Sequence, residues 1–230
     1  MSLLYWDQKK KIKWATAIAV VFHLVGFAGM MWIDLPGFAA MTPANLILSL
    51  VLIYWTHENP DYTFLFFFFL AFTAGMFAEY LGVNKQLIFG HYQYEDVLGP
   101  KLGGVPWMIG VNWFMVIYSC GITVQTLWNL ARKNNNTNRN EVELLVVILM
   151  GALLAMLFYW LMEPVAIKLR YWTWLAEEGI PSKNYWDWFF VSAFLMMAFK
   201  SMGFSKKNQF ALHLLLIQIL FFLLLRIFLQ

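Results

Sequence analysis

Two glutamates lie where the sequence predicts membrane hydrocarbon, and a carboxyl group in such a place can transfer protons. Glu79 lies near the end of the apolar run Phe64 to Leu81, and Glu163 follows the apolar run Val146 to Met162. A carboxylate at membrane depth costs a few kcal/mol even on lenient insertion scales, so it is retained only with a partner or a function. Two such residues at comparable depths predict a shared site.

A buried amide and a histidine could assist these carboxyl groups. Asn112 belongs to a predicted helix, at most about three turns from the loop before it, and needs a hydrogen-bond partner there. We expect Glu79 or Glu163 to supply that partner. His91, in the segment FGHYQY, could position a water molecule or relay a proton, although a surface histidine with ordinary hydrogen bonds is the alternative.

Six aromatic residues in the neighbouring segments could stabilise a carbocation. Aromatic faces attract cations by about 0.5 to 2 kcal/mol each when the pair is desolvated. The same residue types are common at the membrane interface, where their rings bridge apolar and polar layers, and that role is the alternative for each of them. The candidates are Tyr92, Tyr94, Trp107, Trp113, Trp172 and Trp174.

The elements that must position these side chains are membrane helices. Hydrophobic residues make up 61% of the chain and charged residues 13%, and the mean hydropathy is +0.62, which excludes an ordinary soluble protein. Runs long enough to cross about 30 Å of hydrocarbon predict an all-α polytopic bundle of about seven transmembrane helices, forming one domain over residues 1–230. The predicted helices are Trp14 to Ile33, Pro43 to Thr56, Tyr62 to Leu81, Pro106 to Leu130, Glu143 to Met162, Trp186 to Met202 and Gln209 to Phe228.

The basic residues predict a cytoplasmic N-terminus. In that orientation ten of the sixteen Lys and Arg residues flank the cytoplasmic helix ends, in keeping with the positive-inside rule. They are Lys9, Lys10, Lys11, Lys13, Arg132, Lys133, Arg139, Lys200, Lys206 and Lys207. The helices that carry Glu79 and Glu163 then both run outward, so the two carboxyl groups reach the same leaflet.

Several other kinds of chemistry lack the residues they need. The four histidines are far apart in the sequence, so the histidine clusters of membrane di-iron oxygenases are missing. No GxGxxG segment follows a strand, and no Asp-rich pair of the kind that binds a prenyl diphosphate through magnesium occurs. We therefore expect no metal site and no cofactor. The net charge of +3 arises from the basic flanks and indicates membrane anchoring, not nucleic-acid binding.

Two segments of the chain resemble a known family. They are AGMFAEYLGVNKQLIFGHYQYEDVLGPKLGGVPWMIGVNWFMVIY, from Ala74 to Tyr118, and EPVAIKLRYWTWLAEEGIPSKNYWDWFF, from Glu163 to Phe190. Both resemble the shared segments of the membrane carotenoid biosynthesis family that contains carotenoid 1,2-hydratases, including bisanhydrobacterioruberin hydratase. The chain departs from the family pattern by having Glu163 where Asp is usual and Asp187 where Gly is usual. The first change keeps a carboxylate, and the second adds a charge at the site rim.

The resemblance implies a cofactor-independent hydro-lyase of carotenoid biosynthesis. Such an enzyme adds water across the terminal C1–C2 double bond of an acyclic (psi) end group, as in lycopene or gamma-carotene, and forms a tertiary alcohol. On this expectation Glu79 and Glu163 provide the acid and a water-orienting partner, Asn112 and His91 order water, and the six aromatic residues line the substrate site. The expected partners are a lipid-soluble carotenoid, membrane lipids and other enzymes of carotenoid biosynthesis, in the inner (cytoplasmic) membrane of a bacterium.

Other interpretations use the same residues differently. Glu79 and Glu163 could form a structural polar network with Asn112 and Arg170. The protein could instead be a non-catalytic carotenoid-binding scaffold, or a proton-coupled transporter that uses the two carboxyl groups as carriers. A transporter would be supported by broken helices in two repeated halves, which the sequence does not display. A retinal-binding protein would need a lysine deep within a late helix, and the last predicted helix contains none.

Overall fold

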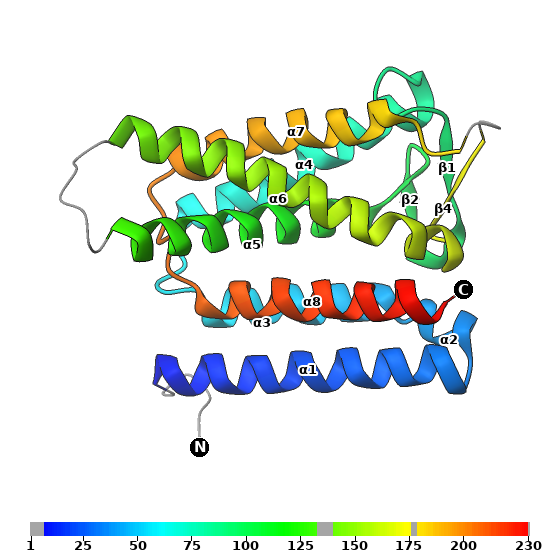
Figure 1. Ribbon diagram of the computed structural model, residues 1–230, viewed down its shortest axis with the longest axis horizontal. Helices are drawn as coiled ribbons and strands as arrows, with labels where there is room; N and C mark the ends of the chain where they lie inside the picture. Colours follow the sequence, from blue (N-terminus) through cyan, green and yellow to red (C-terminus); the bar gives the residue numbers. More distant parts are fainter. Residues whose placement is uncertain (1–6, 133–139, 176–178, 230) are drawn as a thin grey trace.

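The computed structural model describes residues 7–132, 140–175 and 179–229, and it is a bundle of helices with two short antiparallel strand pairs at one end (Figure 1). The prediction of an all-α membrane bundle is confirmed. The helices are α1 (Gln8–Trp32), α2 (Leu35–Ala39), α3 (Thr42–Thr56), α4 (Tyr62–Lys85), α5 (Trp107–Arg132), α6 (Asn140–Lys168), α7 (Ser182–Ser201) and α8 (Gln209–Phe228). The short elements are β1 (Tyr92–Tyr94), the 3-10 turn η2 (Asp96–Leu98), β2 (Lys101–Leu102), β3 (Val105–Pro106) and β4 (Trp172–Trp174).

Six segments of the described chain are long and apolar enough to cross a membrane. They are α1, the segment Leu35–Thr56 that joins α2 to α3, α4, α5, most of α6, and α8. The predicted sixth helix exists as α7 but is not in this set; it carries Lys183, Asp187 and Lys200 and lies alongside α6. Lys133 and Arg139, two of the basic residues used to predict the orientation, lie outside the described residues.

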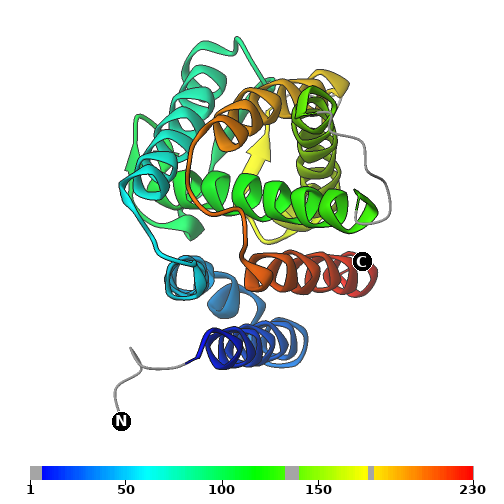
Figure 2. The same ribbon diagram turned by 90° about the vertical axis from the view of Figure 1, so that its left-hand side faces the viewer.

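The helices form three layers, which Figure 2 shows end-on. α1 is the outermost layer, α3 and α8 form the second layer behind it, and α4 to α7 together form the third layer. α5 is the central helix of the bundle. Of its most apolar 18-residue stretch, 72% of the residues are buried, because apolar residues occupy all faces of the helix. The site described below is built where α5 meets α4, α6 and the strands.

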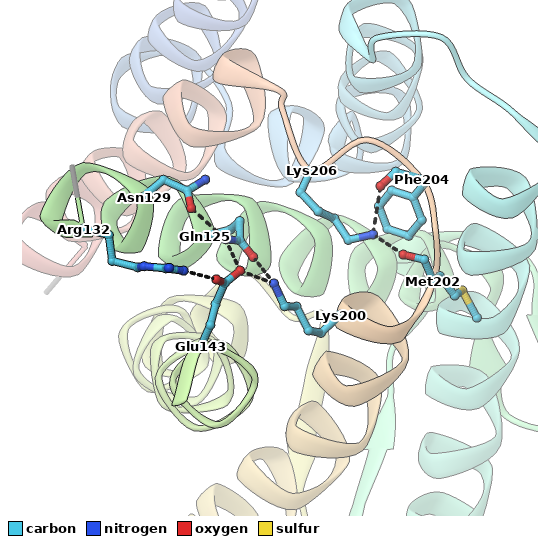
Figure 3. Close-up of polar contacts among 8 residues, drawn as sticks. All are labelled: Gln125, Asn129, Arg132, Glu143, Lys200, Met202, Phe204 and Lys206. Atoms are coloured by element: carbon cyan, nitrogen blue, oxygen red, sulfur yellow. Dashed lines mark hydrogen bonds and ion pairs between the residues drawn. The ribbon is translucent and has the colours of Figure 1, made fainter. Parts of the chain in front are cut away.

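A polar cluster ties α5, α6 and α7 together at the end of the bundle opposite β1 and β4 (Figure 3). The carboxylate of Glu143 accepts hydrogen bonds from Arg132 Nη1 at 2.6 Å and from Gln125 Nε2 at 2.9 Å. Lys200 of α7 donates to the same carboxylate and to the Gln125 side-chain oxygen. The charges are largely shielded from solvent, so this cluster stabilises the meeting point of the three helices more than an exposed ion pair would.

The predicted end of the fifth apolar helix at Met162 is wrong, because α6 continues through Pro164 to Lys168. Proline has no N–H group, so the carbonyl four residues earlier, that of Trp160, loses its helical donor. Arg226 of α8 replaces that donor: its Nη1 lies 3.3 Å from the Trp160 carbonyl oxygen, and its guanidinium carbon lies 4.3 Å from the centroid of the Trp160 ring. A contact from another helix thus compensates the local cost of the proline.

Candidate active site

Two strands carry four aromatic residues to the ends of α4 and α6. β1 and β4 pair antiparallel, with Tyr92 opposite Trp174 and Tyr94 opposite Trp172. Residues two apart in a strand share a face, and opposite residues of a pair share the same face, so all four rings project to one side. The ring centroids of Tyr92 and Trp174 are 5.3 Å apart, and those of Tyr94 and Trp172 are 5.8 Å apart.

The ends of α4 and α6 have the same local design. Each helix ends at a non-glycine residue in the left-handed region, Gln86 at φ 55° and Arg170 at φ 57°. The following backbone N–H groups donate back into the last turn, from Leu87 to the Leu81 carbonyl and from Tyr171 to the Ala166 carbonyl. These turns direct the chain from α4 toward β1 and from α6 toward β4, and they place both strands over the helix ends.

Glu79 is buried, and its carboxyl group accepts hydrogen bonds from three aromatic side chains. The Tyr92 and Tyr94 hydroxyls both donate to Oε2, the Tyr94 bond being 2.8 Å long. Trp113 Nε1 of α5 donates to Oε1 at 3.0 Å. Burial and the neighbouring Glu79 carboxyl group raise the pKa of Tyr92 and of Tyr94 well above the ordinary value of a phenol. Both tyrosines therefore stay protonated and remain donors to Glu79.

Glu163 is fully buried and is held by the other strand. Trp172 Nε1 and Trp174 Nε1 donate to the same oxygen, Oε1, at 2.9 Å and 2.6 Å. The second oxygen, Oε2, meets no donor with hydrogen-bonding geometry, although the Tyr159 hydroxyl, one turn earlier on α6, interacts with the carboxyl group. Glu79 and Glu163 also interact electrostatically with each other, so the structure brings the two predicted carboxyl groups to one pair of strands.

An aromatic stack connects the two carboxyl groups. The rings of Trp113 and Trp188 are parallel within 9° with centroids 3.9 Å apart, and Trp188 stacks on Tyr159 at 4.1 Å. Asn184 Nδ2 of α7 donates to the Tyr159 hydroxyl at 2.9 Å and so fixes its position. Sequence reasoning missed Trp188, Tyr159 and Asn184. The position of Tyr159 four residues before Glu163, on the same helix face, is a signal that could have found it.

A small cavity of about 20 Å³ lies among these groups, and this volume is enough for one water molecule. Glu79 borders it, whereas Glu163 does not. The residues that line the cavity are Glu79, Phe89, Tyr92, Tyr94, Ile109, Asn112, Trp113, Tyr159, Met162, Trp172, Trp174, Asn184 and Trp188. The cavity therefore has one carboxyl group, three phenols and two amides in a mostly aromatic wall.

A second, larger cavity of about 260 Å³ adjoins the first and is predominantly apolar. It lies among α1, α3, α5 and α8, and it shares Ile109, Asn112, Met162 and Trp172 with the small cavity. At its rim Phe22, Val25 and Met41 are 53%, 55% and 60% exposed, in segments that the sequence assigns to the membrane. The larger cavity thus connects the wall of the small cavity with the apolar surface of the bundle.

The structure separates several predicted site residues from the carboxyl groups. His91 is exposed, Trp107 is 47% exposed, and neither side chain lines a cavity. The Arg170 side chain is also exposed, 4.0 Å from Glu95, so the predicted alternative network of the glutamates with Arg170 does not form.

Asn112 lies at the site without the partner that was expected for it. Its side chain forms no hydrogen bond with the part of the chain that the structure describes. Both oxygens of Glu79 and Oε1 of Glu163 accept hydrogen bonds from Tyr and Trp side chains instead. The expectation that a glutamate would bind Asn112 is wrong. Asn112 instead lines both cavities, with an amide that can bind a molecule lying between them.

Among the described residues, no group of three or more His, Cys, Asp or Glu side chains is arranged to hold a metal ion. The polar and aromatic groups that the structure places at the site are carboxyl groups, phenols, indoles and amides. These groups can transfer a proton, orient a small polar molecule and stabilise a positive charge against aromatic faces.

Of three comparisons with known proteins, one gives a match, and it identifies a family. No curated protein and no solved structure gives a significant match to the chain. A family model described as carotenoid biosynthesis protein matches residues 21–230, which include both glutamates, all four strands and the walls of both cavities. The match supports a role in carotenoid biosynthesis, and its extent shows that the chain belongs to the carotenoid biosynthesis protein family.

Proposed function

We propose that this protein is a carotenoid hydratase that adds water across the terminal C1–C2 double bond of an acyclic end group and forms a tertiary alcohol. The observation that carries the proposal is the placement of Glu79: a buried carboxyl group with three donors borders a one-water cavity, and that cavity shares a wall with a large apolar cavity. Hydration of an alkene in a membrane needs these features together.

The apolar cavity is suited to the hydrocarbon part of the substrate. A carotene dissolves in the bilayer core and would enter between α1 and α3, past Phe22, Val25 and Met41. Its end group would lie against Ile109, Met162 and the wall shared with the small cavity. The volume of the small cavity excludes the end group itself, so water and alkene meet at that wall.

Glu79 is the proton donor in this proposal. Its carboxylic acid gives a proton to the water molecule in the small cavity, and that water gives one of its protons to C2, the less substituted carbon, at the shared wall. The π electrons form the new C–H bond, which leaves a tertiary carbocation at C1. The negative charge that then develops on Glu79 faces the Tyr92, Tyr94 and Trp113 donors. Donors aimed at a developing charge in a site without bulk water stabilise the transition state more than the ground state.

Aromatic faces stabilise the carbocation without reacting with it. Trp172 lines both cavities and Trp188 lines the small one, so their rings are available to a cation at the shared wall. Each desolvated face contributes about 0.5 to 2 kcal/mol.

Water then completes the reaction. A water molecule in the small cavity, oriented by the Asn112 amide, forms the C–O bond at C1 and loses a proton to the Glu79 carboxylate. That transfer restores the carboxylic acid, so the cycle consumes one alkene and one water and needs no redox partner. Glu163, which borders neither cavity, is assigned to holding Trp172 and Trp174 in place through its two indole hydrogen bonds.

Pigment analysis tests this proposal. The chain is expressed in bacteria that accumulate lycopene or gamma-carotene, and the extracted pigments are analysed by liquid chromatography and mass spectrometry. A product heavier by one water is expected with the unaltered protein, and it should be lost in Glu79→Gln and strongly reduced in Glu163→Gln. Glu58→Gln, which alters an exposed carboxylate after α3, is the matched control and should retain full activity.

Other outcomes would remove the proposal. A product heavier by one oxygen would indicate an oxygenase. Unchanged pigments with both carotenes, in cells where membrane insertion is demonstrated, would favour a carotenoid-binding scaffold or a proton-coupled transporter. Full hydration by Glu79→Gln would remove Glu79 from the mechanism while leaving the hydratase assignment in place.

A further inference from the structure

Three helices each place a polar side chain in the wall of the large apolar cavity, away from the carboxyl groups. They are His23 of α1, Asn45 of α3 and Gln218 of α8, among neighbours such as Met30 and Phe221 that are hydrophobic. His23 is 6% exposed and Gln218 is 7% exposed. The mechanism proposed above uses none of the three.

The hydrogen bonds of His23 define what its ring presents to the cavity. Nδ1 lies 2.7 Å from the Ala19 carbonyl oxygen, which can only accept, so Nδ1 carries the proton. A neutral ring in this tautomer has an acceptor at Nε2. The ring also meets Phe221 edge-to-face at 5.3 Å, which holds its orientation between α1 and α8.

Asn45 and Gln218 leave further hydrogen-bonding capacity at the same cavity. The Asn45 Oδ1 atom is buried and has no hydrogen-bond partner. The Gln218 amide forms no hydrogen bond with any residue that the structure describes, and it offers a donor as well as an acceptor. A buried polar group without a partner lowers stability, so groups of this kind in an apolar cavity point to a ligand that pairs with them.

The available hydrogen-bonding groups match a hydroxyl. A hydroxyl donates one hydrogen bond and accepts others. His23 Nε2 and Asn45 Oδ1 can accept its proton, and the Gln218 amide can donate to its oxygen. Most of the remaining wall is apolar, which suits an alcohol on an apolar chain better than a hydrated ion or a column of water.

We propose that His23, Asn45 and Gln218 form a binding site for the tertiary hydroxyl group of the product. This inference rests on the proposed hydratase function, because the hydroxyl is the polar group that hydration creates on the end group. Binding the hydroxyl at these residues holds the product apart from Glu79, where the reverse step, protonation and loss of water, would occur. The site therefore favours the alcohol over the alkene in the same cavity.

A binding comparison tests the site without requiring turnover. The Glu79→Gln protein is placed in nanodiscs, and quenching of its tryptophan fluorescence is measured with lycopene and with 1-hydroxy-1,2-dihydrolycopene. The alcohol should bind about tenfold more tightly, the difference expected for one or two neutral hydrogen bonds. Gln218→Leu and Asn45→Leu, made separately in this background, should each reduce the preference to about twofold or less while lycopene binding is kept.

Met30→Leu, an apolar change in the same wall, is the matched control and should keep the preference. Equal affinities of the two pigments for the parent protein, or a preference that survives both leucine substitutions, would overturn the site. The outcome of this binding test does not depend on the outcome of the pigment assay. If the protein prefers the alcohol but the unaltered protein forms no hydrated pigment, the hydroxyl site stands and the proposed hydratase activity is wrong.

Discussion

A carboxyl group that gives up a proton inside hydrocarbon needs its negative charge stabilised as the charge forms. Glu79 has two phenols and one indole directed at its two oxygens, whereas Glu163 has two indoles on a single oxygen. The two glutamates are similar in the sequence but differ in their donors and in their access to the small cavity. At the scale of residues, this difference is the basis of the proposed roles, which are proton transfer for Glu79 and positioning of Trp172 and Trp174 for Glu163.

Tyr92→Phe should slow hydration by about 10- to 100-fold, because it removes one donor to the Glu79 carboxylate while keeping the ring. The loss should appear in kcat rather than in KM, since the bond strengthens as charge develops. Initial rates of formation of the hydrated pigment in membranes measure the effect. Gln93→Ala, on the exposed face of β1, is the control. An unchanged kcat in Tyr92→Phe would contradict this role of the phenol.

At the scale of elements, β1 must pack closely against α4 for its Tyr92 hydroxyl to reach Glu79. A Cβ atom added at Gly82 would lie 2.6 Å from the Tyr92 hydroxyl oxygen and 3.1 Å from Phe89 Cδ2. The absence of a side chain at Gly82 therefore lets the tyrosine reach Glu79, three residues earlier on the same helix. The nearest neighbour of Gly82 is thus a strand residue, not a residue of another helix.

Gly82→Ala should displace Tyr92 and reduce hydration at least about tenfold, with a loss of stability of about 1 to 3 kcal/mol from the overpacked contact. Gly203→Ala is the matched control, because a Cβ atom there would meet nothing within 4 Å and its backbone is not in the left-handed region. Both variants are compared by pigment assay and by thermal unfolding in detergent. Equal activities would show that β1 tolerates the shift.

A second prediction at this scale concerns the hydrogen bond from Arg226 that compensates for Pro164 in α6. Arg226→Met should reduce the free energy of unfolding by about 1 kcal/mol, because the Trp160 carbonyl loses its donor. The melting temperature should fall accordingly. In a Pro164→Ala background the alanine N–H can restore the helical bond, so the same Arg226→Met change should cost less. Thermal unfolding of the four proteins in one detergent gives the coupling. Purely additive effects would mean that Arg226 does not compensate for the proline.

At the scale of the whole molecule, the two ends of the bundle have separate tasks. One end carries the strands and the glutamates, and the other carries the Glu143 cluster and the connection from α7 to α8 (Figure 3). In that connection Lys206 Nζ donates to the Met202 carbonyl at 2.7 Å and lies 3.2 Å from the centroid of the Phe204 ring. Burial, with the nearby charge of Lys200, lowers the pKa of Lys206 to about 7.

The lowered pKa of Lys206 predicts how global stability depends on pH. Between the folded value of about 7 and the ordinary value of 10.5, the unfolded chain binds a proton at this residue that the folded chain does not. The free energy of unfolding should therefore increase with pH between these two pKa values. Below about pH 7 this residue is protonated in both states and contributes no further pH dependence. Thermal unfolding across the window should show the rise, and Lys206→Met should flatten it, with exposed Lys207→Met as control. A rise that persists in Lys206→Met would assign it to other groups.

Three features could be predicted from the amino-acid sequence alone: the membrane class, the number and approximate position of the long helices, and the arrival of Glu79 and Glu163 at one end of the bundle. These follow from local properties: runs of apolar residues set the helices, and their lengths and directions set the depth of a charge. The resemblance in the segments around both glutamates was equally local, and the family match confirmed it.

Which side chains contact one another depends on how distant segments of the chain pack together. Tyr92 pairs with Trp174 across positions far apart in the chain, Trp188 stacks between Trp113 and Tyr159, and His91 faces outward although it adjoins Tyr92. α6 continues past its proline because Arg226 of another helix supplies a donor. Both cavities are spaces left between helices, so their volumes and walls depend on how side chains from distant segments pack. Local sequence patterns carry no information on such contacts, and that is why the different surroundings of the two glutamates, on which their proposed roles rest, could be found only in the fold.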